Sequence, residues 1–193
     1  MDRLEILVEE PSMAEVLRGI LPRVLPEGWE LDVNCFIRHH EGKQDLQRSI
    51  PRKIRVARNK SITTGFIILQ DQDSNDCRDL KTQLVNICEE AGRGSSLVPF
   101  KVRIVCHELE SWYLGDMDAI ESVFPRFHAD NYRNKRQFRH PDECVSPKQE
   151  LKRLVGDYPQ IATARDISAH MKIEDNISPS FRCFISCIRQ MVD

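Results

Sequence analysis

The feature that most constrains the fold is a short apolar run, Gly65–Leu69, which leads directly into the polar stretch QDQDSND. The run contains Phe and two Ile residues, and no polar residue interrupts it. A strand with one face in water alternates apolar and polar residues, whereas a strand covered on both faces is apolar throughout. The run therefore predicts a strand that is buried in a sheet with helices on both sides.

Three further β-type runs alternate along the chain with patterns of helical period. The runs cover residues 4–8, 29–37 and 102–106. The expected helices cover residues 11–21, 44–59, 76–92 and 108–123. Strands that alternate with helices indicate an α/β fold. We expect a mostly parallel sheet of about four strands, flanked by helices and connected by right-handed crossovers.

The character of the chain changes after Phe124. Residues 126–144 are polar and rich in Arg, His and Asn, which is typical of a long loop. Helical patterns return near residues 147–156, 161–171 and 178–191, with no strand pattern between them. We therefore expect an α/β core at residues 1–124, with a polar loop and a helical C-terminal extension at 125–193 packed on it.

Composition indicates a soluble globular protein. Hydrophobic residues make up 40% of the 193 residues and charged residues 30%, and the net charge is −2. A nucleic-acid role would therefore need a local basic face. No apolar run approaches the roughly 20 residues that cross a bilayer, and the N-terminus does not resemble a signal peptide. Seven cysteines without a CxxC pair favour reduced thiols. A cytoplasmic protein with no membrane contact is expected.

Acidic residues follow three of the four predicted strands. They are Glu9 and Glu10, Asp71 and Asp73, and Glu108 and Glu110. The carboxyl ends of parallel strands meet at one edge of a sheet, where ligands of α/β proteins bind. Carboxylates brought together there repel each other unless a cation or shared protons relieve the repulsion. Oxygen ligands favour Mg²⁺ or Mn²⁺, which could bind and polarise a phosphodiester.

Each acidic residue also has a simpler interpretation. Asp71 and Asp73 lie on the same side of an extended backbone and can face one ion, but they could also form a polar loop. Glu9 could complement the dipole of the helix that follows it. Asp76 either caps the next helix or joins the site. Glu108 could approach the metal as an outer ligand, with Glu110 as an accessory residue.

Basic residues near the same edge could contact phosphate. Lys43 belongs to the loop HHEGK, Arg52 to the basic helix that follows, and Lys148 to a predicted helix start in SPKQEL. A solvated surface explains each of them as well. A second basic group at residues 126–139 is interleaved with Phe127, Tyr132 and Phe138. That pattern suits single-stranded nucleic acid, and it equally suits a mobile surface loop.

Several motifs resemble the Toprim domain of topoisomerases, primases and overcoming-lysogenization-defect nucleases. They are LVEEPSM, EGKQDL, ILQDQDSNDC, CHELESWYLGD and SPKQELKRL, which span residues 4–155. The sequence is most similar to an uncharacterised bacterial Toprim-like family that is often encoded beside an AAA-type or ABC-type ATPase. The resemblance implies a Toprim-like (Rossmann-like) sheet.

In that comparison Glu9 takes the role of the Toprim glutamate, as a metal ligand or a general acid/base. Asp71 and Asp73 take the role of the metal-binding DxD pair. Many Toprim domains have glycine after the glutamate, where Glu10 stands here. Either glutamate could therefore face the metal, and we favour Glu9. The resemblance makes Glu9, Asp71 and Asp73 the predicted catalytic residues, with Mg²⁺ or Mn²⁺ as the cofactor.

The resemblance implies a metal-dependent phosphodiesterase, a nuclease that acts with an ATPase partner in bacterial anti-phage defence. The alternative is a non-catalytic Toprim-like module that binds an ATPase or nucleic acid. A phosphatase of the haloacid dehalogenase type is disfavoured, because its DxD motif follows the first strand and here that strand ends in Glu-Glu. DNA and RNA substrates are both compatible with the sequence, and so is an oligomer.

Overall fold

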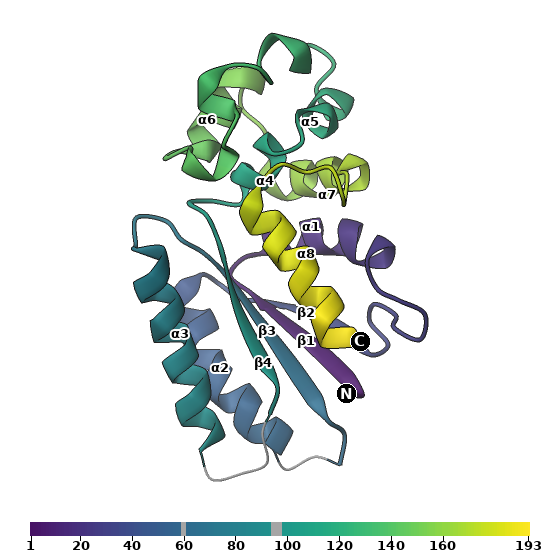
Figure 1. Ribbon diagram of the computed structural model, residues 1–193, viewed down its shortest axis with the longest axis vertical. Helices are drawn as coiled ribbons and strands as arrows, with labels where there is room; N and C mark the ends of the chain where they lie inside the picture. Colours follow the sequence, from purple (N-terminus) through teal and green to yellow (C-terminus); the bar gives the residue numbers. More distant parts are fainter. Residues whose placement is uncertain (59–60, 94–97) are drawn as a thin grey trace.

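The fold is built on one sheet of four parallel strands in the order β2-β1-β3-β4 (Figure 1). The computed structural model describes residues 1–58, 61–93 and 98–193. The strands are β1 (Arg3–Val8), β2 (Cys35–His39), β3 (Thr64–Asp71) and β4 (Phe100–Val105). All eight residues of β3 are buried, as the apolar run predicts. The expected α/β class with a parallel sheet is confirmed.

Helices cover both faces of the sheet. The helices α1 (Pro11–Ile20), α2 (Lys43–Arg58) and α3 (Cys77–Gly92) connect successive strands. On one face, α2 and α3 pack against Leu7, Phe66 and Ile68. On the other face, α1 and α8 (Pro179–Val192) pack against Ile67 and Leu69 (Figure 1). Alternate residues of β3 therefore belong to two separate cores, and this is why its sequence shows no polar alternation.

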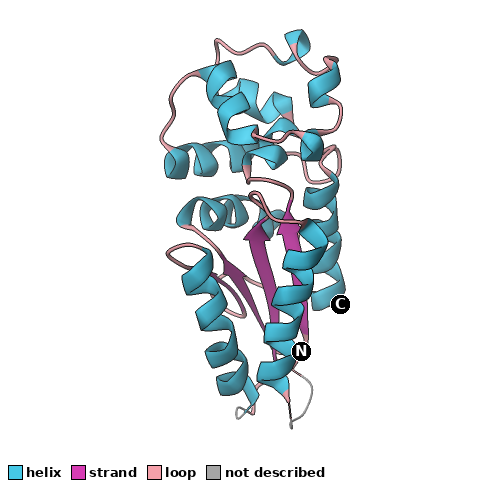
Figure 2. Ribbon diagram, turned by 90° about the vertical axis from the view of Figure 1, so that its left-hand side faces the viewer, coloured by secondary structure: helices cyan, strands magenta, loops and turns pink. Residues whose placement is uncertain are grey.

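The remaining helices stand beyond the carboxyl ends of the strands, as Figure 2 shows. They are α4 (Glu110–Leu114), α5 (Met117–Val123), α6 (Pro147–Val155) and α7 (Gln160–His170). Short 3-10 helices are η1 (Leu21–Arg23), η2 (Ala129–Asn131), η3 (Arg136–Phe138) and η4 (Pro141–Glu143). None of the helices in the described residues combines the length and the apolar character needed to cross a membrane.

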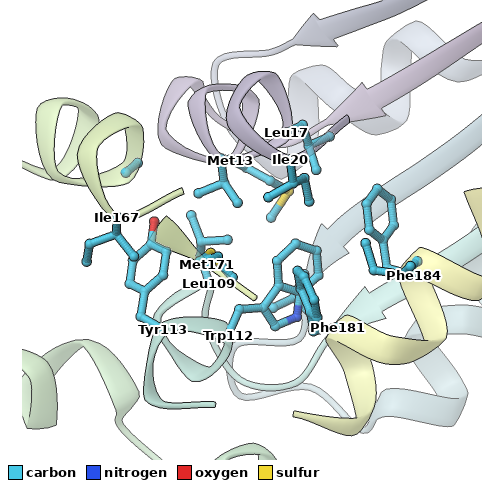
Figure 3. Close-up of a cluster of buried hydrophobic side chains, with 14 of the residues drawn as sticks. Met13, Leu17, Ile20, Leu109, Trp112, Tyr113, Ile167, Met171, Phe181 and Phe184 are labelled. Atoms are coloured by element: carbon cyan, nitrogen blue, oxygen red, sulfur yellow. The ribbon is translucent and has the colours of Figure 1, made fainter. Parts of the chain in front are cut away.

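The C-terminal helices share a core with the first helix (Figure 3). Trp112 of α4 is fully buried, and its ring lies 5.2 Å from that of Phe181 and 5.4 Å from that of Phe184. The indole Nε1–H donates to Ser180 Oγ at 3.0 Å, so its polar atom is satisfied. This hydrophobic cluster is continuous across residue 124. The predicted division into residues 1–124 and 125–193 therefore stays a prediction that rests on composition alone.

Two local predictions are wrong in detail, and a third lies partly outside the described residues. The second strand begins at Cys35 and not at Trp29, because Asp32 has a left-handed backbone (φ +64°) and its N–H donates to the Cys35 carbonyl. The helix predicted at residues 108–123 is two helices. Asp116 separates them, since its carboxylate accepts from Ala119 N–H as the cap of α5. The helix predicted to end at Asn59 is observed to Arg58, and residues 59–60 lie outside the described residues.

The aromatic residues of the polar segment are not stacking platforms for bases. Phe127 and Phe138 are buried. The Tyr132 ring stacks on Phe127 at 5.2 Å, and Lys135 Nζ lies 4.2 Å from the centre of the Tyr132 ring. The aromatic residues therefore pack within the segment and stabilise it. In the sequence alone, this role and contact with nucleic acid give the same pattern.

Candidate functional site

The carboxyl edge of the sheet brings Glu9 and Asp71 together, because β1 and β3 are neighbours. Asp71 is the last residue of β3 and is buried, and Glu9 follows β1 directly and is half-buried. Glu9 Oε2 and Asp71 Oδ1 are both buried and, among the described residues, neither has a hydrogen-bond partner. Burial of an unpaired carboxylate oxygen is costly, so this arrangement favours a proton or a cation.

The pKa values of the two groups show the same cost. Burial raises the pKa of Glu9 to about 7, and the charge of Asp73 adds to the rise. A backbone N–H of Asp71 and the charge of Lys43 oppose it. Burial raises the pKa of Asp71 well above its usual value, and the charge of Glu9 is the next largest cause. The charge of Glu9 therefore makes the ionised form of Asp71 less favourable, and the charge of Asp73 does the same to Glu9.

Asp73 and Lys43 complete this side of the edge. Asp73 has a left-handed backbone (φ +51°), which aspartate tolerates better than most residues. Its N–H donates to the His107 carbonyl at 2.8 Å, which fixes the turn against the end of β4. Lys43 Nζ lies 3.4 Å from Asp73 Oδ2. The loop before Lys43 is held by Gly42, whose N–H donates to the Glu9 carbonyl at 3.0 Å.

Two other acidic residues near this edge have protein partners. The Glu10 carboxylate accepts from Ser12 Oγ at 2.8 Å. Asp76 Oδ1 accepts from the N–H groups of Arg78 and Asp79 at 2.8 and 3.0 Å, so Asp76 is the N-cap of α3. The structure thus gives Asp76 the capping role, one of its two predicted roles. Of Glu9 and Glu10, Glu9 is the one with a buried oxygen that has no partner among the described residues.

The acids after β4 also have protein partners. Glu108 Oε2 accepts from the N–H of Lys148 at 3.1 Å, in the first turn of α6. Glu110 Oε1 accepts from Tyr158 Oη–H at 2.8 Å. Burial raises the pKa of Glu110, and the bond from Tyr158 and the charge of Lys148 oppose this rise.

The predicted phosphate contacts are dispersed. Lys43 lies beside Asp73, and the Lys148 charge acts on Glu110, so both lysines are near the carboxyl edge. Arg52 is exposed, roughly 14 Å further along α2 than Lys43, in a crevice that also includes Glu5 and Lys53. The structure does not bring Arg52 to the carboxylates.

The comparisons with known proteins identify a family. A family model described as "Domain of unknown function (DUF4276)" matches residues 8–189. The chain belongs to the DUF4276 family. No curated protein and no solved structure matches the chain. The matched range includes every acidic residue of the carboxyl edge, but the description of the family assigns no activity. The function of this DUF4276 chain therefore has to be argued from its site.

Sequence reasoning missed two tyrosines near the acids. Tyr158 precedes α7 and satisfies Glu110, and no local pattern marks it. Tyr113 of α4 is buried, and burial raises its pKa, with the charge of Glu110 as the next largest cause. Tyr113 follows Trp112 in an apolar stretch of α4, so the sequence gives no sign that it lies near the acids. Neither residue belongs to a motif that predicts contact with a carboxylate.

The donor set of this DUF4276 edge suits a hard divalent cation with few protein ligands. Within the described ranges, no three His, Cys, Asp or Glu side chains are grouped so as to hold a metal ion. Mg²⁺ needs fewer, because it keeps several waters and binds through one or two carboxylates together with substrate phosphate. The unpaired oxygens of Glu9 and Asp71, with Asp73 beside them, fit that requirement.

Proposed function

We propose that the protein is a phosphodiesterase of Toprim type that depends on Mg²⁺ or Mn²⁺ and cleaves nucleic acid. One observation supports this most strongly: two buried carboxylate oxygens, on Glu9 and Asp71, have no partner among the described residues. They lie at the carboxyl ends of neighbouring parallel strands, where α/β proteins bind ligands. If the two carboxylates had only a structural role, nothing would offset the cost of burying their unpaired oxygens.

The side chains divide the chemistry between them. Glu9, Asp71 and Asp73 would hold the cation, which when bound polarises a phosphoryl oxygen and makes water a better nucleophile. Glu9 has an alternative role as general acid/base, since burial raises its pKa to about 7, close to neutral pH. Lys43, beside Asp73, offers a positive charge to the phosphate. Lys148 is a weaker candidate for the same role. The outer-ligand role of Glu108 stays a prediction of the sequence and is not part of this proposal, because its carboxylate already accepts from the Lys148 N–H.

The biological setting belongs to the same proposal. An ATPase partner and a role in bacterial defence come with the Toprim resemblance of LVEEPSM and ILQDQDSNDC, and a cytoplasmic location comes from the cysteine usage and the lack of a long apolar run. The second candidate function is a non-catalytic module that binds an ATPase or nucleic acid. It is favoured by the absence, within the described residues, of a group of three metal-ligating side chains.

Purified protein incubated with plasmid, single-stranded DNA and tRNA tests the proposal. We expect cleavage with Mg²⁺ or Mn²⁺ and none with EDTA. An Asp71→Asn/Asp73→Asn variant should lose activity on the order of 10²–10³-fold, the scale seen when a charge-stabilising group is removed from an active site. The matched control is Glu89→Gln/Glu90→Gln, which removes two exposed charges of α3 and should keep full activity.

Two results would contradict the proposal in different ways. Full activity in the Asp71/Asp73 variant would show that cleavage occurs elsewhere on the protein. No cleavage of any substrate, together with no heat of Mg²⁺ or Mn²⁺ binding in calorimetry, would support the non-catalytic module.

A further inference from the structure

Two adjoining cavities lead away from the carboxylates along the start of α6. The first lies at the carboxyl edge and is lined by Asp73, His107 and Glu108. The second, of about 1050 Å³, is lined by basic residues of the polar segment: Arg136, Arg139 and His140. Both are also lined by Val145, Ser146 and Gln149, so they meet along this segment.

Two arginines of the second cavity are available to bind a ligand. Arg136 is exposed and has no ion-pair partner in the described part of the chain. Arg139 uses its Nε–H to donate to the Asn134 carbonyl at 3.2 Å, and its two terminal nitrogens stay uncommitted there. Of the two acids that line this cavity, Glu150 is paired with Arg153 at 2.6 Å, and Glu143 is exposed. With Glu150 paired to Arg153, two arginines face one acid, Glu143, so the cavity keeps one net positive charge and guanidinium donors suited to phosphate.

The junction of the two cavities contains one apolar residue, Val145, beside the polar Ser146 and Gln149. Val145 is 77% exposed, although a branched aliphatic side chain is favoured in contact with other apolar groups. It stands between an acidic end suited to a metal and a basic end suited to phosphate. A ligand that follows this path is best matched when it offers phosphate at both ends and an apolar surface that can contact Val145. A strand of nucleic acid has this composition, and its bases are free to reach Val145 only when they are unpaired.

We propose that these cavities form a substrate groove for single-stranded nucleic acid. The scissile phosphate lies in the first cavity beside Asp73, next to the edge that holds Glu9 and Asp71, the strand passes Val145, and flanking phosphates bind Arg136 and Arg139. This inference rests on the proposed phosphodiesterase function and names its substrate class. It assigns a binding role to the polar segment, through two arginines and not through the aromatic residues that lie between them in the sequence.

Binding in EDTA separates this inference from catalysis. The probe is a fluorescein-labelled single-stranded oligonucleotide of about 12 nucleotides, within the size range of single-strand sites. We expect Arg136→Glu/Arg139→Glu to weaken binding about 10-fold or more. The plot of log affinity against log salt should become shallower by about 0.7 for each phosphate that the variant no longer binds. The matched control, Lys81→Glu/Arg182→Glu, changes two exposed residues that line neither cavity and should bind like wild type.

A small substrate supplies the second readout. Bis(p-nitrophenyl) phosphate has no flanking phosphates, so Arg136→Glu/Arg139→Glu should lower cleavage of the oligonucleotide far more than hydrolysis of this small substrate. The milder Arg136→Gln/Arg139→Gln variant should show a smaller loss of oligonucleotide binding in the same direction, with an unchanged melting temperature in both variants.

Each outcome decides one question. Wild-type binding in Arg136→Glu/Arg139→Glu, or binding of a duplex as tight as that of the single strand, would overturn the groove. If wild type hydrolyses neither substrate but the arginine variants still lose single-strand binding, the groove stands and the phosphodiesterase proposal fails.

Discussion

The two groups of acids at the carboxyl edge have the same chemistry and opposite surroundings. Glu108 and Glu110, after β4, accept hydrogen bonds from the Lys148 N–H and the Tyr158 hydroxyl. Glu9 and Asp71, after β1 and β3, each keep a buried oxygen with no partner in the described residues. The protein thus satisfies one pair by itself and leaves the other pair to a proton or a cation. Partners, and not residue type, distinguish a structural carboxylate from a candidate ligand.

The elements near each pair explain the difference. The helix α6 and the residues before α7 reach the end of β4 and bring donors with them. The ends of β1 and β3 meet the loop before α2, where Lys43 pairs with Asp73. Glu9 accepts a hydrogen bond from the backbone N–H of Asp71, and the charge of Lys43 also favours its ionised form, but neither offsets the effect of burial.

Removal of Glu110 should have the largest effect on stability and would show the structural role directly. Glu110→Ala should lower the free energy of unfolding by about 1–3 kcal/mol, because it leaves the half-buried Tyr158 hydroxyl without its acceptor. Asp71→Asn, measured in EDTA, should cost nothing or stabilise, because it removes a buried charge without breaking a hydrogen bond of Oδ1. Urea unfolding of both variants is the measurement.

Tyr158→Phe is the control for this pair. If Glu110 and Tyr158 act together, the double variant should cost less than the sum of the single variants. An equal loss of stability in Asp71→Asn and Glu110→Ala would remove the distinction between the two groups.

Glu9 should contribute to the pH dependence of stability, together with the other acids whose pKa values burial raises. Its pKa is raised from 4.5 to about 7 in the folded protein, so between these values the folded state holds a proton that the unfolded state has lost. Through this residue the free energy of unfolding of the metal-free protein falls as pH rises from 4.5 to 7, and then levels off. Glu9→Gln should remove this contribution and be more stable than wild type at about pH 8 in EDTA.

Thermal unfolding between about pH 4.5 and pH 8 measures this effect, with Glu10→Gln as the control because Ser12 already bonds Glu10. Added Mg²⁺ should stabilise wild type at the alkaline end of this range and stabilise Glu9→Gln less, since binding to the folded state alone raises its stability. Identical pH profiles for wild type and Glu9→Gln would show that Glu9 is not held in a raised-pKa state.

The sequence predicts what depends on local pattern and on adjacency. The apolar run at 65–69 predicts a buried strand, and the alternation of strands with helices predicts the parallel sheet, which places Glu9 and Asp71 at one edge. Asp76 shows where prediction from local sequence stops, because an aspartate at this position suits both a helix cap and a metal ligand. Only its two bonds from backbone N–H groups decide in favour of the cap.

Partners distant in sequence cannot be predicted in this way. Glu108 and Glu110 find donors 40 and 48 residues further along the chain. No periodicity connects such positions, because the contact depends on where α6 and α7 pack. For the same reason the aromatic residues of the polar segment resemble a nucleic-acid surface in the sequence, whereas two of them are buried.

Glu108 provides the smallest expected effect and the sharpest check on the comparison. Its carboxylate faces the N-terminus of α6, where a negative charge contributes about 0.3–1 kcal/mol. Glu108→Gln keeps an acceptor for the Lys148 N–H and loses the charge, so the free energy of unfolding should fall by no more than that amount. The heat of Mg²⁺ binding and the cleavage rate should stay at wild-type values. If Mg²⁺ affinity falls together with cleavage, Glu108 is the outer ligand that its sequence position suggests. The acids after β4 would then belong to the metal site despite their protein partners, and an unpaired oxygen would no longer be the criterion that separates the two groups.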